Sequence, residues 1–152
     1  MIDLYALPED FTRFEEAQQK SDPSEKVACL ETGLLNDIND HRFMPYIQLH
    51  EFEALLLTDP TKFAGLFLEP EYKENIEKLV AMTQGFDVPE LINDGAETAP
   101  SKRIEKVIPR YEKVKASAGI LIAQEIGLEK IREKCPHFNE WLSKLESLNP
   151  DE

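Results

Sequence analysis

The chain has 152 residues, of which 41% are hydrophobic and 31% charged, the size and composition of one globular domain. Its 30 acidic residues outnumber 17 basic ones and give a formal charge of -13, which repels phosphate backbones and anionic membranes unless basic residues gather locally. No apolar run approaches the roughly 20 residues that span a bilayer, and the first residues lack the basic flank of a signal peptide. We therefore expect a cytoplasmic protein without a membrane partner.

The first fifty residues predict a strand, a helix and a second strand. The apolar segment 2–7 ends at Pro8, which suits a strand because proline cannot donate to a sheet. Apolar residues recur every three or four positions between Ser24 and Asn39 and predict a helix of about four turns. Residues 44–49, MPYIQL, favour a second strand. A helical crossover of this length makes the two strands parallel.

The rest of the sequence predicts helices only. These are expected at residues 51–57, 60–67, 70–84, 101–107, 111–117, 120–126 and 136–148. The last of them carries one apolar stripe that we expect in the core, made of Phe138, Trp141, Leu142, Leu145 and Leu148. The sequence thus predicts a helix-rich α/β fold in one domain, 1–152, with a βαβ-like part at 1–57 and a helical part at 58–152.

A sheet of two parallel strands is unusually small, since parallel sheets are normally larger and covered on both faces. We therefore expect that the chain is the later part of a larger α/β unit, or that it completes its sheet with a second copy as a homo-oligomer. Met1 directly precedes the first strand. This places Asp3 near the start of that strand, away from the carboxyl end where open α/β sheets bind ligands.

The densest polar cluster follows the second strand and contains His50, Glu51 and Glu53. It is not the HExxH zinc motif, because Ala54 stands four residues after His50. Two carboxylates and an imidazole could hold Mg²⁺, which takes one or two carboxylates and keeps several waters. Asp3 is a further candidate ligand if strand register brings it to the same edge. The alternative is that both glutamates only stabilise a helix N-terminus and Asp3 is an exposed strand residue.

A basic segment, TAPSKRIEKVIPRYEKVK, interrupts the acidic sequence. A helix that begins near Ser101 would combine free backbone N–H groups with the charges of Lys102 and Arg103, a suitable phosphate site. The alternative is a solvated helix face that pairs with surrounding acids. The sequence has no GxSxG elbow, P-loop or GxGxxG, so serine hydrolysis, triphosphate hydrolysis and dinucleotide binding are disfavoured.

Four segments resemble successive blocks of the bacterial domain-of-unknown-function family 4276. They are MIDLYALP, RFMPYIQLHEFEALLLTDP, PELINDGAETAPSKRI and IGLEKIREKCPHFNEWLSKL, and together they span nearly the whole chain. The resemblance implies a Toprim-like fold with acidic residues around Mg²⁺, and metal-dependent phosphodiester chemistry in a defence system with a partner ATPase. By position it implies metal ligands at Asp3, Glu51 and Glu53, catalytic roles for His50, Glu51 and Glu53, and phosphate binding by Ser101, Lys102 and Arg103.

The resemblance also has a gap. Family members begin with an extra strand that ends in a Glu-Gly-x-Thr-Glu loop, and this chain begins after it. The function we expect is therefore an incomplete Mg²⁺-dependent nucleic-acid-processing module, with nuclease-like activity only when the missing segment is supplied. The alternative is a non-catalytic interaction protein that docks a partner ATPase or a second copy.

Overall fold

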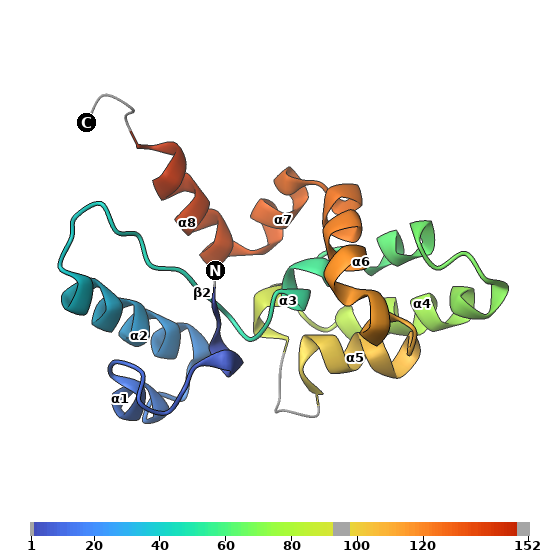
Figure 1. The fold of residues 1–152 in the computed structure, drawn as a ribbon. Helices are drawn as coiled ribbons and strands as arrows, with labels where there is room; N and C mark the ends of the chain where they lie inside the picture. Colours follow the sequence, from blue (N-terminus) through green and yellow to red (C-terminus); the bar gives the residue numbers. More distant parts are fainter. Residues whose placement is uncertain (1, 93–97, 149–152) are drawn as a thin grey trace. The chain divides into compact units, whose positions relative to one another are not determined.

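The computed structural model describes residues 2–92 and 98–148 and has a helix-rich α/β fold with a small parallel sheet, as the sequence predicts (Figure 1). The chain divides into two compact units. Residues 1–49 and 137–152 form the first unit, and residues 50–136 form the second. The division expected after residue 57 falls inside the second unit, and the single-domain assignment stays a prediction.

The first unit contains the sheet. Its elements are β1 (Ile2–Asp3), the 3-10 helix η1 (Leu4–Ala6), α1 (Phe14–Gln18), α2 (Pro23–Ile38), β2 (Ile47–Gln48) and α8 (Pro136–Glu146). The strands pair in parallel, with Ile2 opposite Ile47 and Asp3 opposite Gln48. The predicted parallel pairing is therefore confirmed, and α1 is a helix that the sequence reasoning missed.

The prediction of a strand over residues 2–7 is wrong beyond Asp3. The chain turns into η1 there, and both Leu4 and Leu7 pack against the first unit's core. A 3-10 turn has three residues per turn, so it places these two leucines on one face, whereas a strand would point them to opposite faces. Asp3 consequently stands at the carboxyl end of β1 and not near its start.

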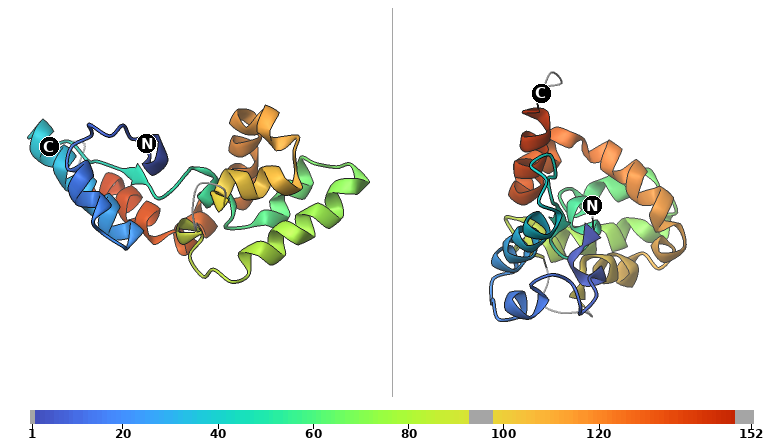
Figure 2. Two further views of the ribbon diagram at one scale, coloured as in Figure 1. Left: turned by 90° about the horizontal axis from the view of Figure 1, so that it is seen from below. Right: turned by 60° about the vertical axis from the view of Figure 1, so that its left-hand side comes forward.

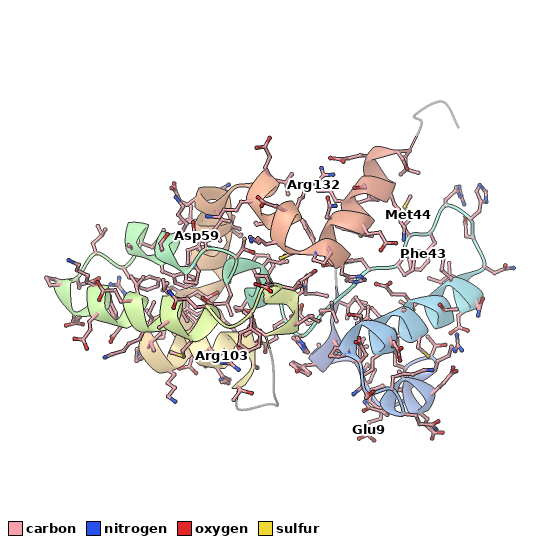
Figure 3. All side chains as sticks on the ribbon, turned by 180° about the vertical axis from the view of Figure 1, so that it is seen from behind. Glu9, Phe43, Met44, Asp59, Arg103 and Arg132 are labelled. Atoms are coloured by element: carbon pink, nitrogen blue, oxygen red, sulfur yellow. The ribbon has the colours of Figure 1, made fainter. Side chains whose placement is uncertain are left out.

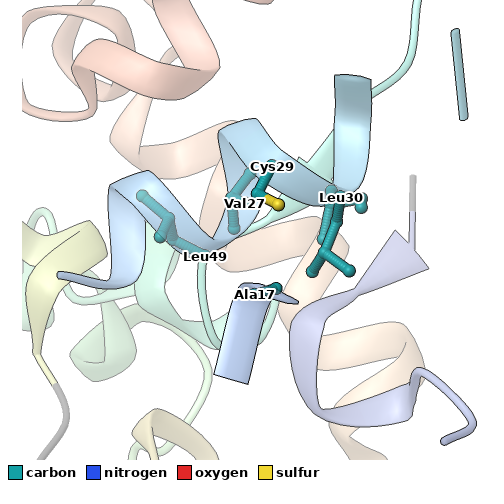
Figure 4. Packing of buried hydrophobic residues seen from close by; sticks show 6 residues of the cluster. Ala17, Val27, Cys29, Leu30 and Leu49 are labelled. Atoms are coloured by element: carbon teal, nitrogen blue, oxygen red, sulfur yellow. The ribbon is translucent and has the colours of Figure 1, made fainter. Parts of the chain in front are cut away.

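Local capping fixes α2 close to its predicted bounds. The Asp22 carboxylate accepts hydrogen bonds from the backbone N–H groups of Ser24 at 2.7 Å and Glu25 at 3.3 Å, and Pro23 occupies the first turn. Asn39 ends the helix in the left-handed conformation, with φ of 49°. One face of α2 enters a core with α1 and the strand β2 (Figure 4). Its buried members are Ala17, Val27, Cys29, Leu30, Ile47 and Leu49.

The predictions for β2 and α8 need correction. Strand pairing covers only Ile47 and Gln48 of residues 44–49. The stripe on α8 is not buried, since no residue of α8 is in the buried class. Instead, Phe138 and Trp141 contact the ring of Tyr46, which is itself 6% exposed. The terminal helix covers this tyrosine with its rings and leaves its leucines partly or fully exposed.

All secondary-structure elements among the described residues of the second unit are helices. It contains α3 (Glu53–Leu56), the 3-10 helix η2 (Pro60–Gly65), α4 (Pro70–Thr83), the 3-10 helix η3 (Pro89–Leu91), α5 (Pro100–Val107), α6 (Tyr111–Ile126) and α7 (Leu128–Lys134). In Figure 2, α4, α5 and α6 lie side by side. Of the predicted helices, 51–57 is shorter and 60–67 is a 3-10 helix, while α7 and η3 were not predicted.

The two helices predicted at 111–117 and 120–126 are one continuous helix, α6. Gly119 lies inside this continuous helix and allows close packing. A Cβ atom at this position would lie 3.2 Å from Cε1 of Phe52 and 3.7 Å from Cδ1 of Leu56. The missing side chain lets α6 approach the segment that enters α3, which brings Tyr111 of α6 and Glu53 of α3 into one neighbourhood.

A search of the described helices finds none with the length and apolar character that a bilayer crossing requires. Both cysteines, Cys29 and Cys135, are buried. Burial raises the pKa of the Cys135 thiol to about 12, so Cys135 is an unreactive packing residue.

Asp59 stabilises the second unit at the start of η2 (Figure 3). Its carboxylate accepts hydrogen bonds from the N–H and hydroxyl of Thr61 at 3.2 and 2.5 Å, and from Lys130 Nζ at 2.8 Å. Burial favours the neutral acid, but the hydrogen bonds from Lys130 and Thr61 outweigh it and hold the pKa of Asp59 below its ordinary value.

Replacing Asp59 by asparagine should therefore lower the free energy of unfolding by about 1–3 kcal/mol at pH 7, measured by urea denaturation. Because the folded-state pKa is depressed, the difference between the two proteins should shrink as pH falls through that pKa. Glu74→Gln is the control, since its pair with Lys78 is exposed and screened by solvent and should contribute little. Equal effects of both substitutions would contradict this role for Asp59.

Candidate functional site

The acidic block enters the second unit through a strained turn. His50 has a φ of 64°, the left-handed region that a non-glycine residue adopts at a cost of about 1 kcal/mol or more. Its side chain is only 3% exposed. Such strained, buried positions cluster at functional sites. The turn at His50 fixes the direction in which the next residues, Glu51 and Glu53, leave the segment after β2.

Glu51 joins the two blocks that the sequence reasoning singled out separately. Its Oε2 atom accepts a hydrogen bond of 2.9 Å from the backbone N–H of Ser101. Ser101 is fifty residues away in the sequence and is the second residue of α5. The residue before the helix is Ala99, which has no capping side chain, and Pro100 has no N–H. Glu51 therefore supplies the cap of α5, and the N–H of Ser101 is occupied by a carboxylate.

Glu53 is the most perturbed acid of the site. It is 8% exposed, and the hydroxyl of the fully buried Tyr111 donates to its Oε1 atom at 3.3 Å. Burial, and next the charge of Glu51, raise the pKa of Glu53 above its ordinary value. Burial and the charge of Glu53 also raise the pKa of Tyr111, so its phenol stays protonated at any physiological pH. The sequence reasoning missed Tyr111, although it stands within the basic segment.

The two basic residues at the start of α5, Lys102 and Arg103, make different contacts. Lys102 donates to Glu105 at 2.6 Å, and that hydrogen bond raises the pKa of Lys102, with a smaller contribution from the charge of Glu51. Arg103 instead donates through Nε to the backbone carbonyl of Thr98 at 2.7 Å and lies 5.7 Å from the ring centre of Phe86 (Figure 3). Its guanidinium thus holds the start of α5 in place.

The donor set suits a mostly hydrated cation and not a closed protein cage. Within residues 2–92 and 98–148, no group of three or more His, Cys, Asp or Glu side chains is arranged to hold a metal ion. What the second unit offers is a pair of carboxylates: Glu51 accepts from Ser101 with one oxygen, and Glu53 accepts from Tyr111 with one oxygen. Mg²⁺ is bound in proteins by one or two carboxylates with several waters, so Glu51 and Glu53 fit that mode.

Asp3 belongs to the first unit, where it ends β1 and is partly buried. Its convergence with Glu51 and Glu53 of the second unit stays a prediction. The structure brings together Glu51, Glu53, Ser101 and Lys102 of the predicted site residues, whereas Arg103 has turned to Thr98.

A comparison with protein families decides the relationship that the four sequence blocks suggest. The model of one family, described as "Domain of unknown function (DUF4276)", matches residues 1–146. The chain belongs to this family. No curated protein and no solved structure matches it. The match includes both the acidic block at 50–53 and the basic block at 101–103, so the site lies within the DUF4276 region of the chain.

The raised pKa of Glu53 predicts a specific pH dependence. A group whose folded-state pKa is raised contributes stability below its unfolded pKa and loses it as pH rises through the folded pKa. Glu53→Gln, which keeps an oxygen acceptor for Tyr111, should therefore be more stable than the wild-type protein at pH 8. The advantage should vanish below the ordinary glutamate pKa of about 4.3.

Thermal unfolding followed between pH 4 and pH 8 measures this difference. Glu112→Gln, an exposed carboxylate next to Tyr111 in the sequence, is the control and should show no such pH-dependent gain. A Glu53→Gln protein that loses stability at pH 8 would show that ionised Glu53 is a favourable partner in the fold.

Proposed function

We propose that this DUF4276 chain is a Mg²⁺-dependent nucleic-acid-processing module of the Toprim-like kind. The observation that carries the proposal is the hydrogen bond between the Glu51 carboxylate and the N–H of Ser101. It unites an acidic block suited to a cation with a basic block suited to a phosphate, although the two are fifty residues apart in the sequence.

In this proposal the cation is held by Glu51 and Glu53, with waters in its remaining positions. Mg²⁺ bound there supplies positive charge that neutralises a phosphate oxygen. Glu51 is already oriented by α5, because its Oε2 atom is fixed on Ser101. A carboxylate fixed in this way loses little conformational freedom when it binds a ligand.

Glu53 and Tyr111 couple the proposed cation site to protons. Because burial raises the pKa of Glu53, a cation held there would displace a proton, and such perturbed groups concentrate at active sites. Tyr111 remains protonated and donates to Glu53, which orients the carboxyl group. His50 would act as a positioning residue, because its strained, buried backbone sets where Glu51 and Glu53 begin.

The phosphate side of the proposal rests on Lys102 at the start of α5. Its Nζ atom lies 2.6 Å from Oε2 of Glu105, and the Lys102 side chain is 52% exposed, so a phosphate can compete for the ammonium group from solvent. The positive end of the α5 dipole adds to the attraction. Arg103 takes no phosphate in this arrangement and keeps the first turn of α5 attached to Thr98.

Metal-linked stabilisation tests the proposal. At a Mg²⁺ or Mn²⁺ concentration tenfold above Kd, binding should stabilise the protein by about 1.4 kcal/mol, a rise of about 3–6 °C in Tm. Glu51→Gln should abolish the rise, yet its amide oxygen can still accept the N–H of Ser101 and keep α5 capped. The same two proteins are then incubated with labelled DNA and RNA, and Mg²⁺-dependent cleavage or binding is expected only for the wild type.

Glu71→Gln is the matched control, because Glu71 is an exposed acid in the first turn of α4. It should behave as the wild type in both assays, with ionic strength held constant by NaCl. An unchanged Tm with metal, or an equal rise in Glu51→Gln, would refute the cation site. A metal-linked rise without any effect on nucleic acids would leave a cation site of another function.

An open sheet edge favours the alternative function, a non-catalytic protein that docks a partner ATPase or a second copy. Among the described residues the sheet has only two strands, and the first exposes Ile2 at 44%, followed by Tyr5 at 47%. Unpaired strand edges are templates for pairing with another chain. If a second copy binds there, sedimentation should show a concentration-dependent dimer that Ile2→Asp weakens. A monomer at all micromolar concentrations would exclude self-association at this edge.

A further inference from the structure

A cavity of about 380 Å³ lies in the first unit and has no part in the proposed phosphodiester chemistry. It opens between α2, the segment that leads from α2 into β2, and α8. Figure 3 marks Phe43 and Met44 on that segment. The residues that matter to its chemistry are Glu31, Phe43, Met44, Tyr46, His137 and Trp141. Its volume falls in the range of about 300–1,000 Å³ typical of small-molecule sites.

The wall of the cavity favours a flat ligand. Tyr46 is stacked with His137, with ring centres 5.0 Å apart and planes 18° apart, and with Trp141 at 4.6 Å and 26°. The rings of His137 and Trp141 thus each lie roughly parallel to the ring of Tyr46. A planar aromatic molecule can add to such a stack and bury both the ring edges and one face, whereas a tetrahedral group cannot.

The cavity also presents a fixed acceptor. Glu31 is a cavity residue whose side chain is 18% exposed, and its Oε1 atom accepts from the backbone N–H of Ile47 at 2.8 Å. The same atom lies 3.3 Å from Nε2 of His137. This Nε2 also lies 3.1 Å from the carbonyl oxygen of Ile47, so it faces two acceptors and carries a proton. Oε1 is therefore engaged, and Oε2 is left to accept from a ligand.

The indole of Trp141 is not open to a ligand in the same way. Its Nε1–H makes no hydrogen bond to any residue that the structure describes, but it is fully buried and does not face the open cavity. Lys144, the cation at the rim, is paired with Glu140 at 2.7 Å. The charge of Glu31 therefore dominates the cavity, which disfavours anions and favours a neutral ligand that carries N–H groups.

We propose that this cavity binds a nucleobase, which packs against the aromatic wall formed by Tyr46, His137 and Trp141 and donates N–H groups to the Glu31 carboxylate. Guanine fits this description best, because its ring N–H and amino group stand side by side and can both face one carboxylate. Carboxylates accept from base amino groups, and aromatic side chains stack on unpaired bases, in known protein–nucleic-acid recognition. The site goes beyond the proposed Mg²⁺ chemistry and does not depend on it.

Fluorescence of Trp141, the only tryptophan of the chain, tests the proposal directly. Guanosine should quench it saturably. Glu31→Gln should weaken binding at least about tenfold, because an amide that keeps its oxygen on the Ile47 N–H places an NH2 group, which cannot accept, where Oε2 stood. Asp37→Asn, the same chemical change on the exposed part of α2, should leave Kd unchanged.

Two further measurements separate recognition from stacking and from misfolding. Caffeine, a purine whose ring nitrogens carry methyl groups in place of protons, should bind more weakly and be insensitive to Glu31→Gln. Thr32→Leu should fill the cavity and block both ligands without unfolding the protein, because the Thr32 hydroxyl bonds only to the Ala28 carbonyl of its own helix. Absence of saturable quenching by guanosine, or equal affinity in wild type and Glu31→Gln, would overturn the proposal.

Discussion

The second unit depends on a carboxylate that replaces a missing helix cap. Helix α5 begins with Ala99 and Pro100, neither of which offers a capping oxygen, and the first free N–H is that of Ser101. Glu51 accepts it from the far side of the unit. Removing a cap of this kind costs about 0.5–2 kcal/mol. The bond therefore ties the entry of the unit to α5, and it fixes both the acid and the basic block.

This constraint also shapes what the site can do. Because one oxygen of Glu51 is committed to α5 and one of Glu53 to Tyr111, the pair retains enough acceptors for a hydrated ion but not for a closed coordination sphere. Burial raises the pKa of Glu53, so the side chain binds a proton more readily and is a weaker ligand for a cation. The same packing that lets α6 approach, through Gly119, is what buries Tyr111 against these acids.

Sequence reasoning succeeded where structure is encoded locally. Asp22 and Pro23 start α2, and its apolar spacing continues to Ile38, so the helix was predicted nearly to the residue. It failed where a local pattern suits two structures, as with Leu4 and Leu7, whose spacing of three belongs to η1. The two predicted helices at 111–117 and 120–126 are one helix through Gly119, whose packing partner Phe52 is distant in the sequence.

The candidate site divides in the same way. Residue types and strand-end position were enough to select the acids at 50–53 and the basic residues at 101–103. The hydrogen bond from Ser101 to Glu51 and the one from Tyr111 to Glu53 depend on how α3, α5 and α6 pack. A short window of sequence does not contain this information. The cavity beside α8 was hidden for a related reason, since its rings were assigned to the core on periodicity alone.

The first unit is discontinuous, with the whole second unit inserted between Leu49 and His137. Ribosomal synthesis delivers the chain from its amino end, so β1, α2 and β2 emerge long before the helix that covers Tyr46. The second unit is contiguous, so all its residues have been synthesised before α8 emerges. Until then Tyr46 and the cavity beside Glu31 are not covered by α8. Closure of the first unit over Tyr46 by α8 therefore follows the synthesis of the whole second unit.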